Sequence, residues 1–517
     1  MEVGLMPVPN EKPNILLIMA DQLTPFMTGC YGNSEVLTPN LDRLTAKGVR
    51  FDAAYTPCPL CSPARASMMT GRYASDIGCY DNGSVFSSEE PTFAHCLSAS
   101  GYDTVLSGKM HFIGSDQLHG FGKRLTTDIY PAEYQLMPRF VDESRHITQS
   151  DAWGNAANYN AQTAGARPWS VGINYDEETH FRAREYLYGQ AGMNWNDQAV
   201  KDPFFLCVSY HHPHDPFHPS SEDWELYEGK NITLPEITRE MEENYSTLDK
   251  WLNNGFHRSD VFPIKGQKNL YALRRAYSAL VSYIDRKVGE LLADLEATGL
   301  DKNTVVLFTS DHGDMLGEKG MVQKRCFYEW SSRIPLILKR PDEPVPGSTV
   351  STPVSLLDLG PTILDLAGVA IDEGYCPDGH SILPVIQDEE TYLEREVISE
   401  SHGEGVMCPT FMIRRGDYKL TYIHNHERQL FHLPSDPSEL HNLAGSVEYS
   451  EIESSLLSRL MERFDSDKIE KDFFESLKKR RLIQKALGIN KTHWDFQPTF
   501  NASKRYHRVN TAVSDES

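Results

Sequence analysis

The chain has 517 residues, 40% of them hydrophobic and 10% aromatic, and its formal net charge at pH 7 is −23. This length and composition argue against disorder and predict two domains. The acidic balance disfavours nucleic acid and anionic membranes as partners, so a site for an anion must gather its cations locally.

The first predicted elements are a strand and a helix. Asn14 to Met19 is a continuous apolar run, which is typical of a strand buried on both faces of a parallel sheet. Asp21 and Gln22 follow it at the carboxyl end of the strand, where open α/β sheets hold ligands and metals. Thr38 to Leu44 predicts the start of a helix, with a proline in its first turn and an Asn or Thr as its cap.

A cysteine-containing stretch comes next, with the letters CPLCSPARASMMTGRY from Cys58 to Tyr73. Cys61, Pro63 and Arg65 have the spacing C-x-P-x-R, and a Thr-Gly-Arg begins five residues after Arg65. The sequence places Cys61 at a helix N-terminus, where backbone N–H groups favour an anion. Cys58 and Cys61 also form a C-x-x-C, which is found in redox pairs and zinc sites, but the chain has no second one.

Further polar candidates lie in a turn and after the next two predicted strands. Asn82 lies in a predicted turn. Lys109 and His111 come after an apolar run and point to the same side of an extended segment. The strand predicted at 202–209 precedes three closely spaced histidines, which include His214 and are also consistent with a metal site of their own.

The second half of the chain continues the alternation of helix and strand. Apolar residues at helical spacing from Asn269 to Thr298 predict a long amphipathic helix, and a buried strand is predicted at 304–309. This order is typical of a mostly parallel sheet flanked by helices. Asp311 and His312 follow the strand, and Lys324 comes thirteen residues after Asp311.

The strand ends together predict a metal site. Asp21, Gln22 and Asp311 offer oxygen ligands, which hard cations prefer. The imidazole of His312 shifts the preference slightly toward manganese or zinc. Calcium is the expected metal, with manganese as the alternative.

Three regions are predicted along the chain. Residues 1–390 form an α/β catalytic domain. Residues 391–480 form a smaller α+β subdomain, with a small antiparallel sheet between Phe411 and Asn442 and a helix from about Ser450 to Asp465. Residues 481–517 are expected to be an irregular tail.

The Cys61 motif resembles the formylglycine signature of the type I sulfatases, which belong to the alkaline phosphatase superfamily. The resemblance implies that a formylglycine-generating maturation enzyme oxidises Cys61 to the aldehyde 3-oxoalanine, whose hydrate attacks sulfur. It implies these further roles: Cys61 also binds the metal, Arg65 and Lys109 hold the hydrated aldehyde, His111 takes the proton that triggers sulfate release, His214 and Lys324 bind sulfate and protonate the leaving alcohol, and Asn82 hydrogen-bonds near the nucleophile.

Several longer stretches are similar to choline sulfatases, including residues 107–132, 212–216 and 310–318. The similarity breaks at 133–169, where those enzymes carry a tryptophan that faces the quaternary ammonium. Tyr134, Trp153 or Glu404 are candidates to replace it. The C-terminal tail resembles an extension that joins subunits, which implies a homo-oligomer, a dimer or a tetramer.

The sequence therefore predicts a sulfatase acting on a small organosulfate, with choline-O-sulfate as the leading substrate. The alternatives are an aryl or carbohydrate sulfatase, a phosphonate or phosphate ester hydrolase on the same scaffold, and a non-catalytic anion-binding protein. No basic segment precedes the first apolar run, which is too short for a signal core or a membrane span, so a cytoplasmic location is expected.

Overall fold

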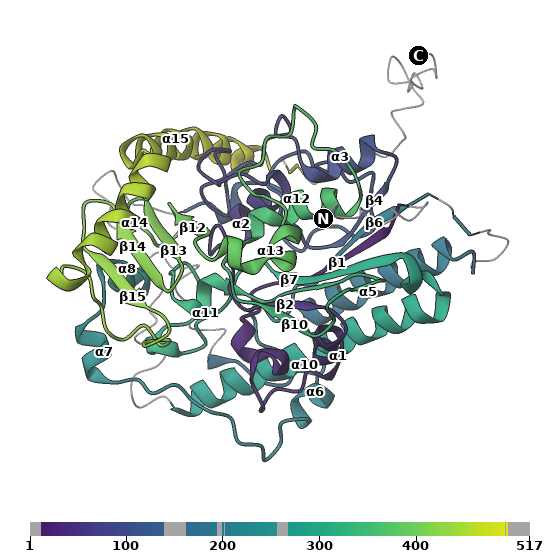
Figure 1. Cartoon of the computed structure of the whole chain (residues 1–517), viewed down its shortest axis with the longest axis horizontal. Coiled ribbons are helices and arrows are strands. Elements are labelled where there is room, and N and C mark those ends of the chain that lie inside the picture. The colour runs from purple at the N-terminus through teal and green to yellow at the C-terminus, as the bar shows by residue number, and fades with distance from the viewer. Residues whose placement is uncertain are drawn as a thin grey trace, which may run out of the picture.

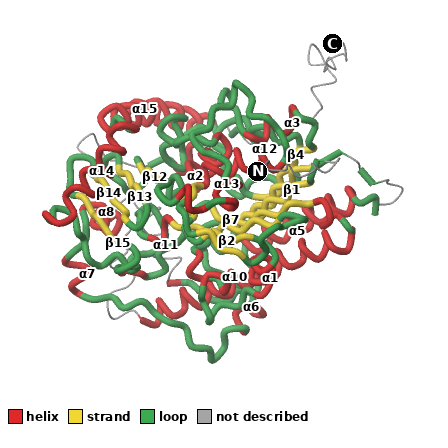
Figure 2. The backbone as a smooth tube through the Cα atoms, viewed as in Figure 1, coloured by secondary structure: helices red, strands yellow, loops and turns green. Residues whose placement is uncertain are grey.

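The computed structural model describes residues 12–138, 162–193, 199–200, 202–255, 267–491 and 493–494. An eight-stranded sheet lies at its centre (Figures 1 and 2). Its strands, from one edge to the other, are β10 (Ser348–Val350), β2 (Val49–Phe51), β9 (Leu336–Lys339), β7 (Thr304–Ser310), β1 (Asn14–Ala20), β6 (Phe204–Ser209), β4 (Asp103–Gly108) and β5 (Lys123–Arg124). Only β9 runs antiparallel to its neighbours. The predicted mostly parallel α/β sheet is confirmed.

The apolar run in β1 is explained by its place in the middle of this sheet. The strand pairs in parallel with β6 on one side and β7 on the other. Leu17 and Met19 belong to the core on one face of the sheet, and Leu16 and Ile18 belong to the core on the other. Because both faces are covered, the strand shows no alternation of polar and apolar residues.

Helices cover both faces of the central sheet (Figure 1). One core contains residues of α2 (Cys61–Thr70), α3 (Phe93–Ala99), α12 (Leu359–Leu366) and α13 (Leu383–Gln387). The other contains residues of α1 (Pro39–Ala46), α5 (Val171–Gln190), α6 (Ser221–Glu225) and the 32-residue α10 (Gln267–Thr298). The predictions of the long amphipathic helix and of a helix that begins at Cys61 are confirmed.

The N-cap of α1 is the expected residue type, but its side chain does not make the capping hydrogen bond. Thr38 occupies this position. Asp285 of α10 caps the helix instead, because its carboxylate accepts hydrogen bonds from the backbone N–H groups of Asn40 (3.0 Å) and Leu41 (2.8 Å). Thr38 is therefore the N-cap residue, as predicted, but a carboxylate supplied by tertiary packing satisfies the helix donors in place of its side chain.

The C-terminal region contains a four-stranded antiparallel sheet. Its strands are β12 (Glu396–Ser401), β13 (Thr410–Arg415), β14 (Tyr418–Ile423) and β15 (Arg428–His432). The predicted antiparallel sheet and its packing against α14 (Ser450–Arg463) are therefore confirmed. α15 (Ser466–Asn490) continues past residue 480, so the predicted boundary at 480 falls inside a helix, whose buried face holds Phe473, Leu477 and Arg480.

Short elements join this region to the central sheet. They are the three-stranded sheet of β11 (Val354–Ser355), β3 (Ala54–Tyr55) and β8 (Arg333–Ile334), and the helices α7 (Arg239–Glu243), α8 (Thr247–Gly255) and α11 (Glu329–Ser332). The Lys419 ammonium in β14 lies 2.8 Å from the Glu329 carboxylate in α11, and both side chains are buried. Buried polar contacts therefore tie the C-terminal sheet to the rest of the chain. None of the described helices has the length and apolar character that crossing a membrane requires.

Candidate active site

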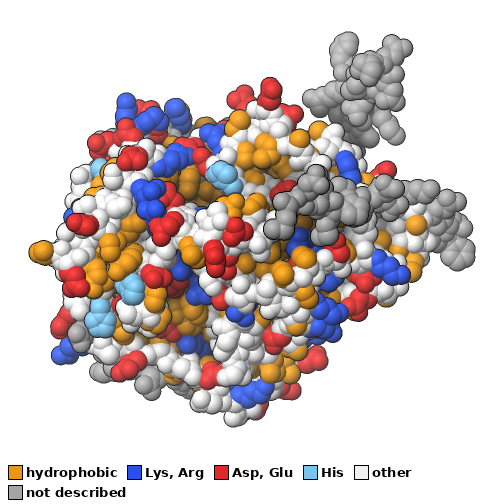
Figure 3. Space-filling model, viewed as in Figure 1, with side chains coloured by type: hydrophobic (Ala, Val, Ile, Leu, Met, Phe, Trp, Pro, Cys, Tyr) orange, Lys and Arg blue, Asp and Glu red, His pale blue; other side chains and the backbone are white. Residues whose placement is uncertain are grey.

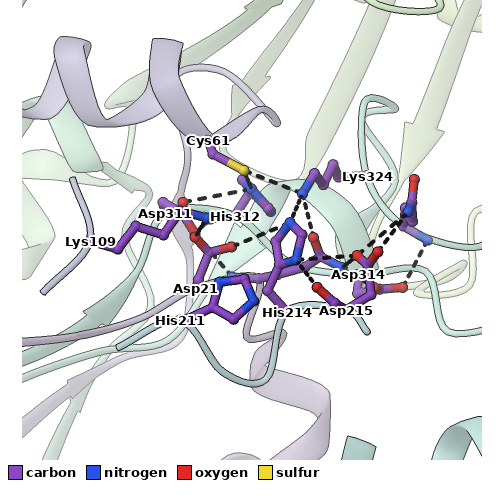
Figure 4. A network of polar contacts seen from close by, with 12 residues as sticks. Asp21, Cys61, Lys109, His211, His214, Asp215, Asp311, His312, Asp314 and Lys324 are labelled. Atoms are coloured by element: carbon purple, nitrogen blue, oxygen red, sulfur yellow. Dashed lines mark hydrogen bonds and ion pairs between the residues drawn. The ribbon is translucent and has the colours of Figure 1, made fainter. Parts of the chain in front are cut away.

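Four neighbouring parallel strands end at one group of polar side chains, and the first residue of α2 meets them there. Figure 4 shows how several of these side chains, Cys61 among them, point toward one another. The strands β4, β6, β1 and β7 run parallel, so their carboxyl ends lie at the same edge of the sheet. The predicted residues that follow or face these ends are Asp21, Gln22, Cys61, Arg65, Asn82, Lys109, His111, His214, Asp311, His312 and Lys324, and all of them are buried.

Four of these residues form a candidate metal centre. The ligand atoms of Asp21, Cys61, Asp311 and His312 all lie within 4.8 Å of one another, and they are the only such group found among the described residues. His312 Nδ1 lies 3.0 Å from the Gly313 carbonyl oxygen, so donation from Nδ1 leaves Nε2 facing the Cys61 sulfur at 3.1 Å. Asp21 Oδ1 is buried and has no hydrogen-bond donor in the described part of the chain. This donor set fits a divalent cation.

Gln22 was predicted to bind the metal, and it lies beside this centre with its side chain already engaged. Its amide oxygen accepts a hydrogen bond from Lys324, and its amide nitrogen donates to Asp314 at 2.5 Å. A longer contact of 3.4 Å joins the same nitrogen to Asp215. The structure therefore links Gln22 to Lys324 directly, and its role as a metal ligand stays a prediction.

Arg65 connects the two acidic strand ends. Its Nε donates to Asp311 Oδ2 at 2.8 Å and its Nη2 to Asp21 Oδ2 at 3.0 Å. A third donor, Nη1, bonds the Lys109 carbonyl oxygen at 2.7 Å. The guanidinium is fully buried and fixes both carboxylates, whereas the resemblance assigned it to the hydrated aldehyde. That assignment stays a prediction.

Lys324 and His214 form a pair of nitrogen groups next to the nucleophile position. Lys324 Nζ lies 2.9 Å from His214 Nε2 and 3.3 Å from Cys61 Sγ. His214 Nδ1 lies 2.6 Å from the Asp215 carbonyl oxygen, which orients the ring. Lys324 therefore contacts Cys61 directly, and His214 lies behind it, in contact with the same ammonium.

The electrostatics of the site favour negative charge. Burial alone would raise the pKa of the Cys61 thiol, but Lys324, Lys109 and His312 outweigh it and hold that pKa well below its usual value. Burial likewise opposes ionisation of Asp21, yet Lys109, His214 and Arg65 keep its pKa lowered. On the face drawn in Figure 3, by contrast, lysines and arginines are scattered among acidic side chains. The basic side chains around Cys61 are therefore gathered inside an otherwise acidic protein, which is the local cluster of positive charge that the sequence predicted for an anion site.

Asn82 and His111 complete the set of predicted residues. Asn82 Oδ1 accepts a hydrogen bond from the Ser62 amide at 3.0 Å and so contacts the first turn of α2. The His111 ring stacks on Tyr130 with a centroid distance of 4.6 Å, and its backbone N–H donates to Asp128 at 2.8 Å. Asn82 therefore contacts the residue after Cys61, and the His111 side chain lies close enough to Cys61 to help lower the pKa of its thiol. The catalytic roles of both residues stay predictions.

Several supporting residues were missed by the sequence analysis. Asp215 and Asp314 contact the Gln22 amide, and a signal for them existed, because each lies within three residues of a predicted site residue. Asp128 and Asp176 bind backbone N–H groups of the loops that follow β4 and β6. Asp128 lies in the stretch 107–132 that is similar to choline sulfatases, so a signal existed for it as well, whereas no local pattern marks Asp176. The sequence analysis also did not name Tyr130. In the structure its ring centroid lies 4.6 Å from Lys109 Nζ.

The two metal and redox alternatives receive no support from the described residues. His212 Nδ1 lies 2.6 Å from the Asp176 carboxylate, and the three histidines form no ligand group of their own there. Cys58 and Cys61 are both free thiols, and burial raises the pKa of Cys58 well above its usual value. A reactive redox pair needs a thiol of lowered pKa that is also accessible, and both of these are buried.

Comparison with known proteins decides the family. A family model described as Sulfatase matches residues 13–369. The chain belongs to the sulfatase family. It is therefore a hydrolase of the alkaline phosphatase superfamily, as the Cys61 motif predicted. A second model, described as N-sulphoglucosamine sulphohydrolase, C-terminal, matches residues 317–466 of this sulfatase.

Individual relatives cover nearly the whole sulfatase. A choline-sulfatase from Rhizobium meliloti (strain 1021) is 38% identical over 506 residues, which is 96% of each chain. An N-acetylglucosamine-6-O-sulfatase from Bacteroides thetaiotaomicron is 28% identical and covers 92% of this chain and 91% of its own. The crystal structure of a phosphonate monoester hydrolase of Agrobacterium radiobacter shares the fold, with a TM-score of 0.69, 22% identity and coverage of 87% of this chain and 95% of its own.

Proposed function

We propose that this sulfatase hydrolyses choline-O-sulfate to choline and sulfate, with a nucleophile derived from Cys61 and a divalent cation. The observation that carries the proposal is the contact of Cys61 with His312 on one side and Lys324 on the other, within a buried group of acidic ligands. The 38% identity with a choline-sulfatase over 96% of the chain supports the choice of alcohol.

The cation would be held by Asp21, Asp311, His312 and the side chain at position 61, with the Gln22 oxygen adjacent. Calcium is the proposed ion, because the two carboxylates supply the hard oxygen ligands that it prefers, and manganese is the alternative because of the imidazole. Such an ion supplies Lewis-acid stabilisation for the charge that develops on sulfate oxygens. Arg65 contributes by holding the two carboxylates in one orientation from a single guanidinium.

Position 61 is proposed to carry 3-oxoalanine, made by a maturation enzyme, and its hydrate supplies the oxygen that attacks sulfur. The residue opens α2, so the sulfate would approach a helix N-terminus, where unpaired N–H groups and the helix dipole favour an anion. Lys109 adds positive charge on the other side of Asp21, and His111 is proposed to take up the proton whose loss completes sulfate release.

Lys324 and His214 are proposed to bind the sulfate and to protonate the departing alcohol. A choline leaving group is a poor one without a proton, so an acid within hydrogen-bond reach of the ester oxygen lowers the barrier. Their 2.9 Å separation lets the ammonium neutralise sulfate charge while the imidazole faces the ester oxygen. Neither group needs to move far, because both are buried and bonded to neighbours.

The alcohol is proposed to be selected by one or more of the three candidates named from the sequence, Tyr134, Trp153 and Glu404. Glu404 forms an ion pair with Arg325, the residue after Lys324, and its Oε2 has no hydrogen-bond donor among the described residues. A carboxylate there would attract a quaternary ammonium. Tyr134 is packed edge-on against Trp494, and the third candidate, Trp153, lies outside the described residues.

The test compares esters on the matured protein. The chain is produced together with a formylglycine-generating enzyme, the Cys61 peptide is checked for the aldehyde by mass spectrometry, and kcat/KM is measured on choline-O-sulfate, an aryl sulfate, a sulfated amino sugar and phosphocholine. The Cys61→Ala variant is the control and should be inactive. Preference for choline-O-sulfate supports the proposal. Preference for the aryl or sugar ester would overturn the choice of alcohol, and preference for phosphocholine would overturn the choice of sulfate.

A further inference from the structure

A buried ion pair joins the C-terminal helix to a turn beside the active site. Arg480 of α15 donates from Nη1 to Asp81 Oδ1 at 2.7 Å and from Nη2 to Asp81 Oδ2 at 2.8 Å. The side chains are 5% and 0% exposed, so water does not screen the pair. Two parallel charge-assisted bonds between a guanidinium and a carboxylate fix orientation as well as distance. The helix is therefore attached rigidly to residue 81.

The carboxylate of Asp81 also shapes the turn that contains Asn82. Its Oδ1 accepts a second hydrogen bond from the Gly83 amide at 2.8 Å, and the backbone N–H of Ser84 donates to the Asp81 carbonyl oxygen at 3.0 Å. Asn82 then accepts from the Ser62 amide at 3.0 Å. Ser62 is the neighbour of Cys61, so a short chain of bonds runs from Arg480 to the residue that follows the nucleophile.

Close packing leaves this turn little freedom to adjust. A Cβ at Gly83 would lie 2.6 Å from the Met137 Cα, so the backbones nearly touch there. On the other side, the Tyr80 ring packs edge-on against Phe473 of α15, with centroids 5.8 Å apart. A shift of α15 is therefore passed on to the turn, because the ion pair and the Tyr80–Phe473 contact join the two and Met137 restrains the turn.

We propose that Arg480 is a positioning residue for the hydrolysis. It acts through Asp81 to hold Asn82, and Asn82 fixes the first turn of α2 and the side chain at position 61. The consequence for turnover rests on the proposed function, in which position 61 carries the nucleophile. A nucleophile displaced by about 1 Å from its productive position can lose about a hundredfold in rate, so a helix far along the chain can control kcat.

The kinetic test uses Arg480→Met and Arg480→Lys, with Arg463→Met as the matched control. Arg463 of α14 also forms an ion pair with the catalytic region, through Asp76, but it does not contact the turn at residues 81–84. Arg480→Met should lower kcat about ten- to a hundredfold with KM nearly unchanged, and Arg480→Lys should lie between it and the wild type. Arg463→Met should keep kcat within about twofold. Equal losses of kcat in Arg480→Met and Arg463→Met would overturn the inference.

A second readout does not depend on turnover. Hydrogen–deuterium exchange at the Ser62 amide and at residues 81–84 should be faster in Arg480→Met than in the wild type, and unchanged in Arg463→Met. If Arg480→Met does not fold, the measurement is made on Arg480→Lys and on Asp81→Asn/Arg480→Met, which removes both buried charges. Unchanged exchange at Ser62 in a folded variant that lacks the pair would overturn the inference. A wild type that is inactive on every ester, with exchange altered as expected, would overturn the proposed function alone.

Discussion

Asp21 contacts several residues of the site that lie far from it in the sequence. Its carboxylate contacts Arg65 and Lys109 and lies within the proposed metal centre. We expect the wild type to bind about one divalent ion per chain, calcium first, and Asp21→Asn to lose both the ion and turnover. Elemental analysis by mass spectrometry measures the ion, and circular dichroism checks that the variant is folded. Full activity of chelated, metal-free protein would contradict this prediction.

Lys324 offers a prediction about sulfate binding. The ammonium is buried beside Cys61 and His214, so its charge acts at close range on a bound sulfate. Lys324→Met should reduce kcat/KM about a hundred- to a thousandfold, because a fixed donor to the developing charge is lost. The control is Lys302→Met, which removes an exposed lysine and should have no measurable effect. Similar kinetics for the two variants would rule out the assigned role.

Asp128 is expected to make the free energy of unfolding fall as the pH becomes acidic. Burial alone would raise its pKa, but Arg124, His111 and backbone N–H groups lower it to about 2. A carboxyl whose pKa is lower in the folded state stabilises the protein above the unfolded value of 3.8, and this contribution is lost as the pH falls toward 2. The loss should be about 2 kcal/mol for this group. Urea unfolding between pH 5 and 2 should therefore show a flatter pH dependence for Asp128→Asn than for the wild type; equal slopes would refute the assignment.

Most residues of the site could be predicted because they follow strands that are recognisable as apolar runs. Asp21, Lys109, His214 and Asp311 each come directly or within a few residues after such a run. The partners of these residues could not be predicted in the same way. Arg65 bonds Asp311 across 246 positions of sequence, and this contact depends on how the strands are ordered in the sheet. The sequence therefore indicates which residues belong to the site, but it does not indicate which of them contact one another.

At the scale of an element, the cap of α1 gives the sharpest prediction. Asp285 accepts from two N–H groups at the start of this helix and from the Asn40 side chain. Asp285→Ala should lower the free energy of unfolding by about 1–3 kcal/mol, because the N–H groups lose a buried acceptor. Glu296→Ala is the control on the same helix, since Glu296 is exposed and its ion pair among the described residues is a 3.5 Å surface pair with Lys47. Equal unfolding curves for the two variants would contradict the capping role.

Helices with a strong apolar periodicity were predicted well, whereas contacts between segments far apart in the sequence were not predicted. α10 was expected from Asn269 to Thr298 and begins two residues earlier, at Gln267. The missed features are contacts between distant segments, such as Asp285 with α1 across 245 positions and Arg480 with Asp81 across 399. Local pattern identifies a helix by its apolar stripe, but it carries no information about which charged side chain will reach its end.

At the scale of the whole molecule, the predicted homo-oligomer can be tested through the C-terminus. Residues 495–517 lie outside the described part of the chain, and the last turns of α15 expose Leu482 (70%) and Ile489 (71%). These two residues are seven positions apart, about two helical turns, so they lie on one face of α15, and an exposed apolar face is typical of a surface that binds another protein. Light scattering should give an oligomer for the full chain and a smaller particle for a chain that ends at Trp494. A monomer in both samples would contradict this prediction.

The order in which the sheet is made sets a time limit on chemistry at Cys61. β1 pairs with β7, and Asn14 lies opposite Thr304, so the middle of the sheet cannot close until residue 310 has left the ribosome. About 250 residues separate Cys61 from that point, and at about 5–20 residues per second their synthesis takes roughly 12–50 s. Afterwards the Cys61 side chain is 1% exposed. An enzyme that oxidises this cysteine therefore has to act before the chain folds, or else on a chain that has come unfolded again.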